Sequence, residues 1–582
     1  MRWNVVFFII LLSFMPSVWA QWSSDSTQNT AIVALAGDQV VPKIGATSDG
    51  GCYISWYDNR SGNYAVYLQR LTRNGEKVWT IDGLLISDHP QDTWVTDYDL
   101  TVDQDDNAIL VFNDIRNGSE NGWDVFAYKI SPSGEFLWGP DGICLSPAVN
   151  SESEMSPKVT VTTSGNYVVT WTRSGDNDVV ALQKLSSDGA KMWGENGIVI
   201  TGQQGGNANH PQIISAANDS VIVLWKNVIG SYPATKVFLL LQKITPQGTF
   251  AWGETGVLIY DNEHIPVYYD PVLIPDGNSG AFAAWAEQPT SAESYVEVGH
   301  VAADGSLVFP LNGIKTALTA SRLHMAPSIA FNQSLNALFA FWLEENSSQN
   351  QFGIYGQRLD AQGNRLWGDD GKVFIPLGER SISFVRCAGT DTSEYIAYFQ
   401  SSAANTYDDA VKDFLLDPAG NFLWGPVTLS AASLGEKDDL VLTLNPSNQL
   451  FFAWTDKRSD SGDIYAQNSN PDGTMGNWVA HLKSVPTLRP RTFVLFPSFP
   501  NPFNPATHIR VGLPHAAHIT LAIYDMTGRL VRTLYQGNLP AGVHTFRWNG
   551  RKENGDTAPS GIYFCRFRTA TFRTAQKLIL LK

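Results

Sequence analysis

A repeat of about 57 residues, present eight times, constrains this chain more than any other feature. Each repeat contains an apolar run that ends in an aromatic residue, as in YISW and VVTW. These aromatic residues follow one another at intervals of 54 to 60 positions, at Trp56, Phe112, Trp171, Trp225, Trp285, Trp342, Phe399 and Trp454. A period of this length, sustained over most of the chain, indicates one repeated supersecondary unit.

A second marker follows each apolar run. It is a glycine turn that leads to another aromatic residue, as in RNGEKVW ending at Trp79 and PAGNFLW ending at Trp424. The eighth copy, PDGTMGNW, ends at Trp478. Both markers therefore give the same count of eight units.

Each repeat divides into four strand-sized segments, which in the third repeat are PKVTVT, NYVVTW, VVALQKL and GIVIT. We name them A to D in chain order. The B segment of the fourth repeat, VIVLW, is apolar on both faces, so a neighbouring sheet must cover each face. We therefore predict an all-β fold whose main part is an eight-bladed β-propeller with four-stranded blades.

The ends of the repeat array predict how the ring closes. The eighth repeat lacks a glycine-led D segment, and TAIVALAGDQVVPKI near the start resembles a D-to-A passage. Residues 31–35 would then complete the eighth blade and leave no open sheet edge. In the alternative, NWVAHL at 477–482 forms that D strand itself.

Composition narrows the function. The 582 residues carry a net charge of −16, which disfavours nucleic acid and anionic membranes as partners. The four cysteines lack CxxC spacing, so we expect neither a zinc site nor a disulfide framework. His89, His210, His264 and His324 fall in separate loops, and we expect no metal and no cofactor.

Domain boundaries follow from changes in composition. Residues 1–20 have a basic start, an apolar run and small residues before a possible cut, which predicts a secretory signal peptide. A membrane anchor is the alternative, but the run is short and nothing later resembles a transmembrane span. We assign 21–482 to the propeller, 483–492 to a linker and 493–582 to a small Ig-like β-sandwich.

The C-terminal domain carries several motifs in order: PNPFNP, IYDMTGR, a tryptophan followed by glycine, SGIYF and a terminal KLILLK. Together they resemble the type A C-terminal sorting domain of cargo of the type IX secretion system. The resemblance implies passage through the periplasm, export by that machinery and an extracellular or outer-membrane surface location. The matching positions are Pro500, Asn501, Pro502, Phe503, Asn504, Pro505, Tyr524, Asp525, Gly528, Arg529, Trp548, Gly561, Tyr563 and Lys577. The propeller part, with GDIYAQ and IYGQRL, resembles secreted bacterial repeat proteins of unknown activity.

Strand parity places the long, variable D-to-A and B-to-C loops on one face, and binding residues concentrate on such loops. The pattern aromatic-x-Asp-x-Arg occurs there in repeats one, two and eight, which are neighbours in a closed ring. These Asp and Arg pairs could hold a polar ligand, with a tryptophan as a stacking surface. The candidate residues are Asp58, Arg60, Trp94, Asp114, Arg116, Trp123, Asp456 and Arg458. The alternative is that each pair braces its own hairpin.

No GxSxG, HExxH or P-loop pattern is present, although this does not exclude catalysis. The even retention of the repeat features favours a non-catalytic protein, because an enzyme should break the repeat at a few convergent polar positions. We expect a secreted or cell-surface binding protein whose ligand is an extracellular glycan or protein. One alternative is a carbohydrate-active hydrolase or lyase, because paired carboxylates leave little local signature; Asp58, Asp114 and Glu344 are the candidates. Another is a structural adhesion component.

Overall fold

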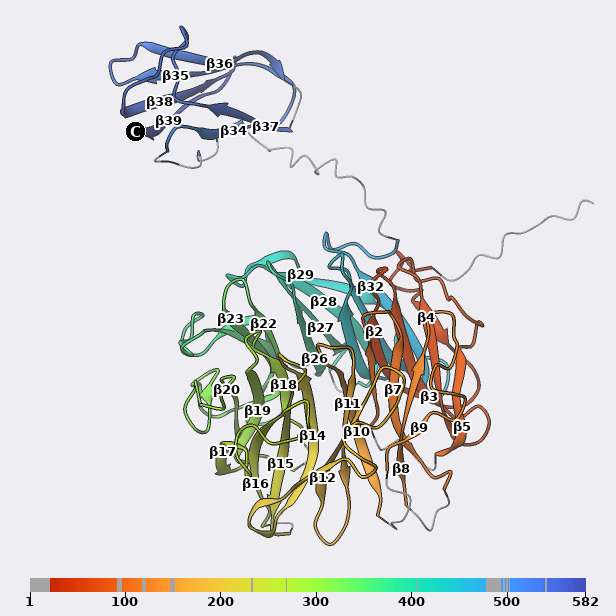
Figure 1. Ribbon diagram of the computed structural model, residues 1–582. Helices are drawn as coiled ribbons and strands as arrows, with labels where there is room; N and C mark the ends of the chain where they lie inside the picture. The colour runs from red at the N-terminus through yellow and green to blue at the C-terminus, as the bar shows by residue number, and fades with distance from the viewer. Residues whose placement is uncertain are drawn as a thin grey trace, which may run out of the picture. The chain divides into compact units, whose positions relative to one another are not determined.

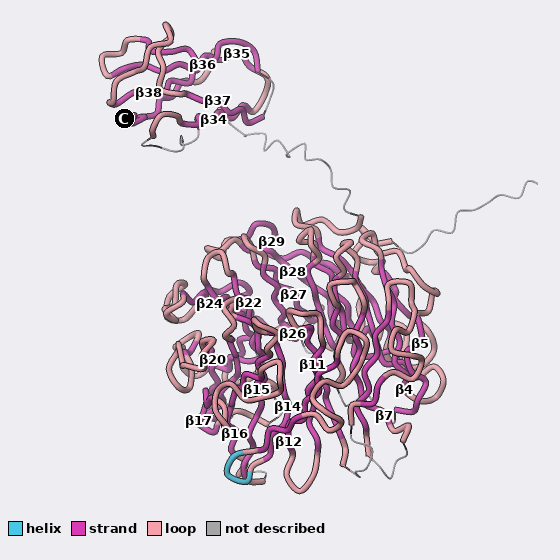
Figure 2. The backbone as a smooth tube through the Cα atoms, in the orientation of Figure 1, coloured by secondary structure: helices cyan, strands magenta, loops and turns pink. Residues whose placement is uncertain are grey.

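The computed structural model describes residues 21–91, 97–117, 122–146, 152–231, 234–267, 269–404, 406–477, 493–495, 498, 501, 503–539 and 542–581. The predicted signal peptide and linker lie outside these residues, as does most of NWVAHL. The chain divides into two compact units, Met1–Trp478 and Val479–Lys582. Figure 2 shows that both consist of strands and loops, with one turn of 3₁₀ helix at Gln203–Gly205.

The described residues of the first unit form eight antiparallel four-stranded blades, two of which, blades five and six, belong to one eight-stranded sheet. The innermost strands are β2 (Gln39–Ala46), β6 (Asp99–Val102), β10 (Glu154–Val161), β14 (Asn207–Ser215), β18 (Val272–Pro275), β22 (Arg322–Asn332), β26 (Ile382–Gly389) and β30 (Lys437–Leu444). The second strands are β3 (Cys52–Asp58), β7 (Ala108–Asp114), β11 (Tyr167–Arg173), β15 (Val221–Ile229), β19 (Ala281–Thr290), β23 (Ala337–Asn346), β27 (Glu394–Ser401) and β31 (Leu450–Asp456).

The third strands are β4 (Tyr64–Leu71), β8 (Asp124–Ile130), β12 (Val179–Leu185), β16 (Lys236–Ile244), β20 (Glu293–Val301), β24 (Phe352–Asp360), β28 (Asp409–Leu416) and β32 (Asp463–Ser469). The outermost strands are β5 (Leu84–Gln91), β9 (Ile143–Cys144), β13 (Ile198–Thr201), β17 (Val257–Glu263), β21 (Ile314–Lys315), β25 (Lys372–Gly378), β29 (Phe422–Ala431) and β1 (Thr30–Val33). Blades five and six are also joined by a single parallel bridge between Ser294 and Leu323.

The innermost strands form a closed ring. Each contacts the innermost strand of the next blade, from β2 to β6 and onward to β30, which contacts β2 again. Figure 1 shows the seam of the ring, with β32 beside β2. The predicted eight-bladed propeller is confirmed, and blades eight, one and two are neighbours.

The N-terminal strand closes the seam as predicted. β1 pairs antiparallel with β32, with Thr30 opposite Ala466 and Ala31 opposite Tyr465. The last blade therefore takes three strands from the end of the array and one from its beginning. This pairing hydrogen-bonds an edge that would otherwise be open to other chains.

Apolar side chains lie between blades rather than within them. One cluster packs Trp56 of β3 and Ile32 of β1 against Phe451 of β31, across the seam. Similar clusters occupy the other seven junctions between adjacent blades. This arrangement explains why the second strand of each repeat is apolar on both faces.

The glycine turns explain the second sequence marker. Gly134 has a positive φ of 87°, and a Cβ there would lie 3.2 Å from the indole of Trp79 in the preceding blade. The same close approach of a turn glycine to the preceding aromatic recurs around the ring, at Gly75 and Trp22, Gly189 and Trp138, Gly248 and Trp193, Gly305 and Trp252, Gly363 and Phe309, Gly420 and Trp367, and Gly473 and Trp424. At the seam it is Trp22 that packs on the turn of blade one. Residues 22–33 thus supply both the aromatic and the D strand of blade eight.

The second unit is the predicted Ig-like sandwich. One sheet has the order β33 (Val494–Leu495), β34 (Thr507–Leu513) and β37 (Gly542–Trp548). The other has the order β36 (Leu530–Leu539), β35 (Ala517–Asp525), β38 (Gly561–Arg568) and β39 (Arg573–Leu580). The core between them contains Trp548, Ile523, Phe567 and Leu578.

Candidate ligand-binding face

In blades one, six and eight, an acidic residue at or near the end of the second strand accepts a bond from the indole two residues before it. Trp56 Nε1 donates to Asp58 Oδ2 over 2.9 Å, and Trp454 Nε1 donates to Asp456 Oδ2 over 2.8 Å. In blade six the acid is a glutamate, since Trp342 Nε1 donates to Glu344 Oε2 over 2.8 Å. The spacing of two residues works because alternate residues of a strand share one face.

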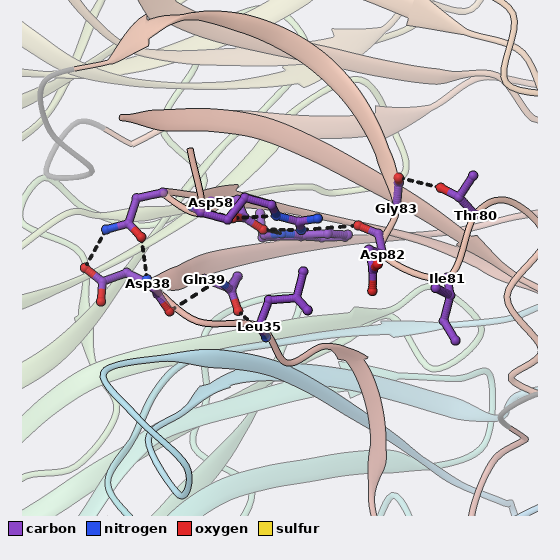
Figure 3. Close-up of polar contacts among 12 residues, drawn as sticks. Leu35, Asp38, Gln39, Asp58, Thr80, Ile81, Asp82 and Gly83 are labelled. Carbon is purple, nitrogen blue, oxygen red and sulfur yellow. Dashed lines mark hydrogen bonds and ion pairs between the residues drawn. The ribbon is translucent and has the colours of Figure 1, made fainter. Parts of the chain in front are cut away.

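Asp58 is fully buried and accepts bonds only from its own blade. Its Oδ1 accepts the backbone N–H of Arg60 over 3.0 Å and the Arg60 Nε over 2.8 Å. The guanidinium lies 4.2 Å above the Tyr67 ring and donates to the carbonyl of Asp82 over 3.2 Å. Figure 3 draws these bonds around Asp58, with Asp82 and Gly83 of the outer segment beside it. The pair ties strand β3 to the segment that precedes β5.

Blades two and eight repeat this brace. Arg116 donates to Asp114 and, over 2.8 Å, to the carbonyl of Asp141, and its guanidinium lies 3.6 Å above Phe126. In blade eight, Arg458 donates to Asp456 over 2.6 Å and to Asn29 over 3.3 Å. Asn29 precedes β1, so the brace joins the two ends of the array.

These contacts support the bracing alternative for the three Asp and Arg pairs. Only 20% of the Arg60 side chain, 10% of Arg116 and 15% of Arg458 is exposed. The ligand-binding role of these residues stays a prediction. Of the proposed stacking residues, Trp94 lies outside the described residues, and Trp123 is half-buried with its carbonyl bonded to the Glu154 N–H.

The innermost strands carry a recurring bulge. In blades one, three, four, six, seven and eight, the register between the first two strands shifts at one position. The bulged residue has a positive φ, for example 55° at Val41 and 51° at Ser156. A bulge bends a strand and re-aims the following side chains, and such features cluster next to functional sites.

Charged side chains follow these bulges. Lys43 Nζ lies 2.6 Å from Asp97 Oδ1, and Lys158 Nζ contacts the other carboxylate oxygen of Asp97. Burial opposes ionisation of Asp97, but the two ammonium groups together hold its pKa below the usual range. Blades one, two and three are thereby joined near the axis by a carboxylate between two cations.

A second charged cluster connects blades four and five. Asp270 Oδ1 lies 2.8 Å from Lys226 Nζ and 3.0 Å from His210 Nδ1. Burial alone would raise the pKa of Asp270, but the bond from His210 and the charge of Lys226 lower it to about 2. Lys226 itself is fully buried and also donates to the carbonyl of Val267 over 2.7 Å.

We call the adjacent hollow between blades five, six and seven the axial pocket; it has a volume of about 430 Å³. It is lined by Tyr269, Asp270, Val272, Ala286, Ala326, Pro327, Ser328 and Arg386. Arg386 lies on β26, and burial lowers the pKa of its guanidinium. It donates to the carbonyl of Val385 over 3.2 Å but forms no ion pair with any described residue. A cation that loses hydration without gaining a carboxylate is unfavourable, and groups of this kind often mark binding sites.

Sequence reasoning missed this pocket. The sequence feature that could have indicated the pocket is a proline near the start of an innermost strand, followed directly by a side chain near the axis. The pattern occurs as VPKI at 41–44, SPKV at 156–159, HPQI at 210–213, DPVL at 270–273 and APSI at 326–329. Periodicity alone could not show that these segments converge on the axis.

The carboxylates considered for catalysis lie in separate blades. Glu344 is buried, bonded to Arg322 over 3.0 Å and 3.3 Å from the His324 ring. Burial raises the pKa of Glu344 and lowers that of His324 to about 4. In blade five, burial and the neighbouring Glu287 raise the pKa of Glu297 well above the usual range of a glutamate. Asp58 and Asp114 belong to the braces above.

The residues that could bind a metal ion are dispersed over the described ranges. In the described ranges, no group of three or more His, Cys, Asp or Glu residues converges to hold an ion. Asp103, Asp105 and Asn107 lie in the turn between β6 and β7, in which Asp103 accepts the Asn107 backbone N–H over 2.8 Å. No helix in the described part of the chain has the length and apolar character that a membrane crossing requires.

Many of the predicted sorting-motif residues build the sandwich itself. Asn501 bridges the chain ends, because it donates to the Lys577 carbonyl over 2.9 Å and accepts from the Ile579 N–H. Phe503 packs 5.4 Å from Trp548, which lies 5.0 Å from Tyr563. Asp525 caps a turn that contains Gly528 and Arg529, Tyr524 lies on β35, and Gly561 begins β38. Asn504 and Pro505 precede β34, while Pro500 and Pro502 lie outside the described residues.

At the sequence level, one family model and several curated relatives match parts of this chain. The FlgD Ig-like domain model matches residues 501–570. The basal-body rod modification protein FlgD of Salmonella typhimurium is 52% identical over 48 residues, which is 8% of this chain and 21% of that protein. FlgD of Escherichia coli K12 is 47% identical over 58 residues, or 10% and 25%. The chain thus spans about a fifth to a quarter of these relatives.

Solved structures similar to the chain have low identity. The polysaccharide lyase Uly1 has a TM-score of 0.40 and 10% identity, covering 75% of this chain and 91% of that one. A PL25 ulvan lyase has a TM-score of 0.41 and 8% identity, covering 70% and 98%. An α-L-arabinanase of Penicillium chrysogenum has a TM-score of 0.32 and 10% identity, covering 54% and 92%. The sequence match thus assigns residues 501–570 alone, as similar to the FlgD Ig-like domain.

Proposed function

We propose that this chain is exported to the cell surface or beyond it, where the propeller binds an extracellular glycan or protein through the axial pocket. The observation that carries the proposal is Arg386, a cation that lines a pocket of about 430 Å³ without a carboxylate partner among the described residues. An anionic group of a ligand would provide that partner through a paired hydrogen bond.

The opposite wall of the pocket adds selectivity. Asp270 already pairs with Lys226 and contacts the His210 ring, so it is engaged on that wall and leaves Arg386 as the free charge of the hollow among the described residues. Tyr269 and Pro327 contribute apolar surface. A ligand with an acidic group next to hydroxyls, such as a uronic acid, matches this combination of charge and apolar wall.

The test uses residues 21–582 on a glycan array that includes uronate-containing oligosaccharides, followed by calorimetry on hits. We expect Arg386→Ala to weaken binding at least tenfold. Arg365→Ala removes the same charge from a C-to-D turn on the other face and serves as the matched control. Equal loss in both variants would contradict a role for the pocket, and no binding by the unaltered protein would favour the structural adhesion component.

The earlier prediction for the Asp and Arg pairs is tested in the same assay. A triple Arg60→Ala, Arg116→Ala, Arg458→Ala variant removes the three guanidiniums. Unchanged affinity in the folded triple variant would show that these residues are not a ligand site. We expect this result if each pair only braces its own hairpin.

Export through the type IX secretion system is proposed from the motif order in the C-terminal unit. Lys577 is the motif residue to test first. Its side chain is exposed, while its backbone carbonyl accepts a hydrogen bond from the Asn501 side chain. In a host with that machinery, a reporter fused to residues 483–582 should reach the medium or surface. Retention of that fusion in the periplasm, with normal secretion of a known cargo, would overturn the proposal.

A second candidate function is a hydrolase or lyase, favoured by the buried Glu297, whose pKa is raised by burial and by the neighbouring Glu287. A carboxylic acid that stays protonated at neutral pH can act as a general acid. Both side chains are almost fully buried, so a substrate would need blade five to open. Release of new reducing ends from a uronate polymer, abolished by Glu297→Gln, would support catalysis, whereas binding without turnover supports the first candidate.

A further inference from the structure

The two units carry opposite charge. Residues 21–477 contain 25 Lys and Arg against 53 Asp and Glu, whereas residues 493–582 contain 11 against 3. The net charge of the whole chain, −16, hides this contrast. The C-terminal unit is therefore a basic module attached to an acidic propeller.

Its basic residues concentrate on the outer face of one sheet. Along β38, the buried Cys565 and Phe567 alternate with the exposed Arg566 and Arg568. On the neighbouring strand β39, Arg573 is paired with Arg568, and Lys577 is paired with Phe564. Directly opposed residues of an antiparallel pair share one face of the sheet. We call this surface the basic sheet face.

The basic sheet face lacks compensating acids. Arg566, Arg568, Arg573 and Lys577 form no ion pair with any described residue. Like charges placed directly opposite each other on neighbouring strands destabilise a sheet, so the pairing of Arg568 with Arg573 is unfavourable for folding alone. The acids of this unit are engaged elsewhere, since Asp525 caps its own turn and Glu553 accepts the Thr533 N–H.

The same face has a hollow of about 510 Å³. Thr520 and Tyr524 of β35 form one side, and the three arginines with Thr574 form the other. The Arg566 guanidinium lies 4.4 Å from the Tyr524 ring centroid, which holds it over the aromatic face. Cations, hydroxyls and an aromatic ring therefore converge on one concave surface.

We infer that the basic sheet face binds an anionic polysaccharide. Guanidinium groups match the planar geometry of carboxylate and the oxygens of sulfate. Alternate residues of a strand lie about 6.6 Å apart and neighbouring strands about 4.8 Å apart. A polymer with an acidic group on every sugar can contact several of these cations at once, while Thr520, which is paired with Arg568, can hydrogen-bond to sugar hydroxyls.

A polysaccharide fits the surface better than an acidic protein. The core of a protein interface is largely apolar, whereas Arg566, Arg568, Arg573 and Lys577 place four positive charges on this one face. A flat protein surface would also leave the hollow empty. The inference does not rest on the ligand proposed for the propeller, because the basic sheet face belongs to the other unit.

The experiment uses residues 21–582 in affinity electrophoresis and calorimetry with polygalacturonate, dextran sulfate and neutral pullulan. The test variant is Arg566→Gln, Arg568→Gln, Arg573→Gln. The control variant, Arg529→Gln, Arg547→Gln, Lys552→Gln, removes the same charge from exposed positions outside the face. Thermal unfolding verifies that both variants fold.

We expect the unaltered protein and the control to bind the two anionic polymers, with affinity falling as salt rises. The test variant should lose at least tenfold in affinity, and pullulan should not bind. Equal losses in the two variants would overturn the inference, because net charge alone would then explain binding. Tighter binding of poly-aspartate than of either polysaccharide would also overturn it and would identify an acidic protein as the partner.

Discussion

The propeller places ionised side chains inside its blades, whereas the C-terminal unit keeps its charges on the surface. Asp58 and Lys437 are fully buried, and each has ionic and hydrogen-bonding partners within its own blade. In the C-terminal unit, Arg566 and Arg568 are exposed and have no acidic partner. The difference teaches that charge in the propeller serves mainly to hold strands together. The arginines of the basic sheet face form no ion pair with any described residue, so their charge is available to a ligand.

The seam of the propeller should give the largest effect. Trp22 is 3% exposed, stacks 5.2 Å from Phe451 and donates from its indole to the Arg73 carbonyl over 3.0 Å. Trp22→Ala should destabilise the propeller by about 3–5 kcal/mol, because it leaves a cavity at the closure of the ring. Differential scanning calorimetry measures this as a lower propeller transition.

The matched control is Trp548→Ala in the sandwich core, which should lower the other transition instead. Movement of both transitions in either variant would contradict the view that each unit has its own core.

Removal of a buried brace should have the next largest effect. Asp58→Ala leaves Arg60 without its carboxylate and the Trp56 indole without its acceptor, so a loss of about 3 kcal/mol or more is expected. Denaturant unfolding followed by tryptophan fluorescence measures the change. Asp525→Ala, an exposed turn aspartate of the sandwich, should leave the free energy of unfolding nearly unchanged. A negligible effect of Asp58→Ala would mean that the pair does not brace the hairpin.

A buried carboxyl without partners gives the smallest effect and depends on pH. Glu394 of β27 is 1% exposed, both carboxyl oxygens lack a hydrogen-bond partner, and burial raises its pKa to about 8. The folded state therefore binds this proton more tightly than the unfolded state does. The stability that the protonated Glu394 contributes to the folded state is fully present below the ordinary glutamate pKa. This contribution is lost as the pH rises toward and through about 8.

Glu394→Gln removes that dependence. The variant should match the unaltered protein near pH 4 and exceed its melting temperature by about 1–3 °C at pH 8. Melting curves at pH 4, 6 and 8 measure the difference, with Arg568→Gln in the sandwich as a variant whose effect should not grow with pH. An equal shift for Glu394→Gln at all three pH values would show that its ionisation is not the cause.

The sequence by itself determined the number of blades, the strand pattern and the closure of the ring. Each depends on local periodicity, which the repeat displays eight times: apolar on both faces in VIVLW, and a turn glycine before each aromatic residue. The strands of the C-terminal sandwich could also be predicted from the sequence, because strands such as β38 alternate between more buried and more exposed residues. The brace made by Asp58 and Arg60 was foreseen as an alternative because the two residues lie close in sequence.

Only the tertiary structure decided where distant residues meet. Arg386, Asp270 and Ala326 come from three blades, and no local pattern shows that they line one pocket. Trp22 packs at the seam of the ring only because the fold brings it against Phe451, which lies more than 400 positions later in the chain. The physical reason is that strand period and turn chemistry are properties of neighbouring residues, whereas a pocket at the axis depends on how all eight sheets pack around it.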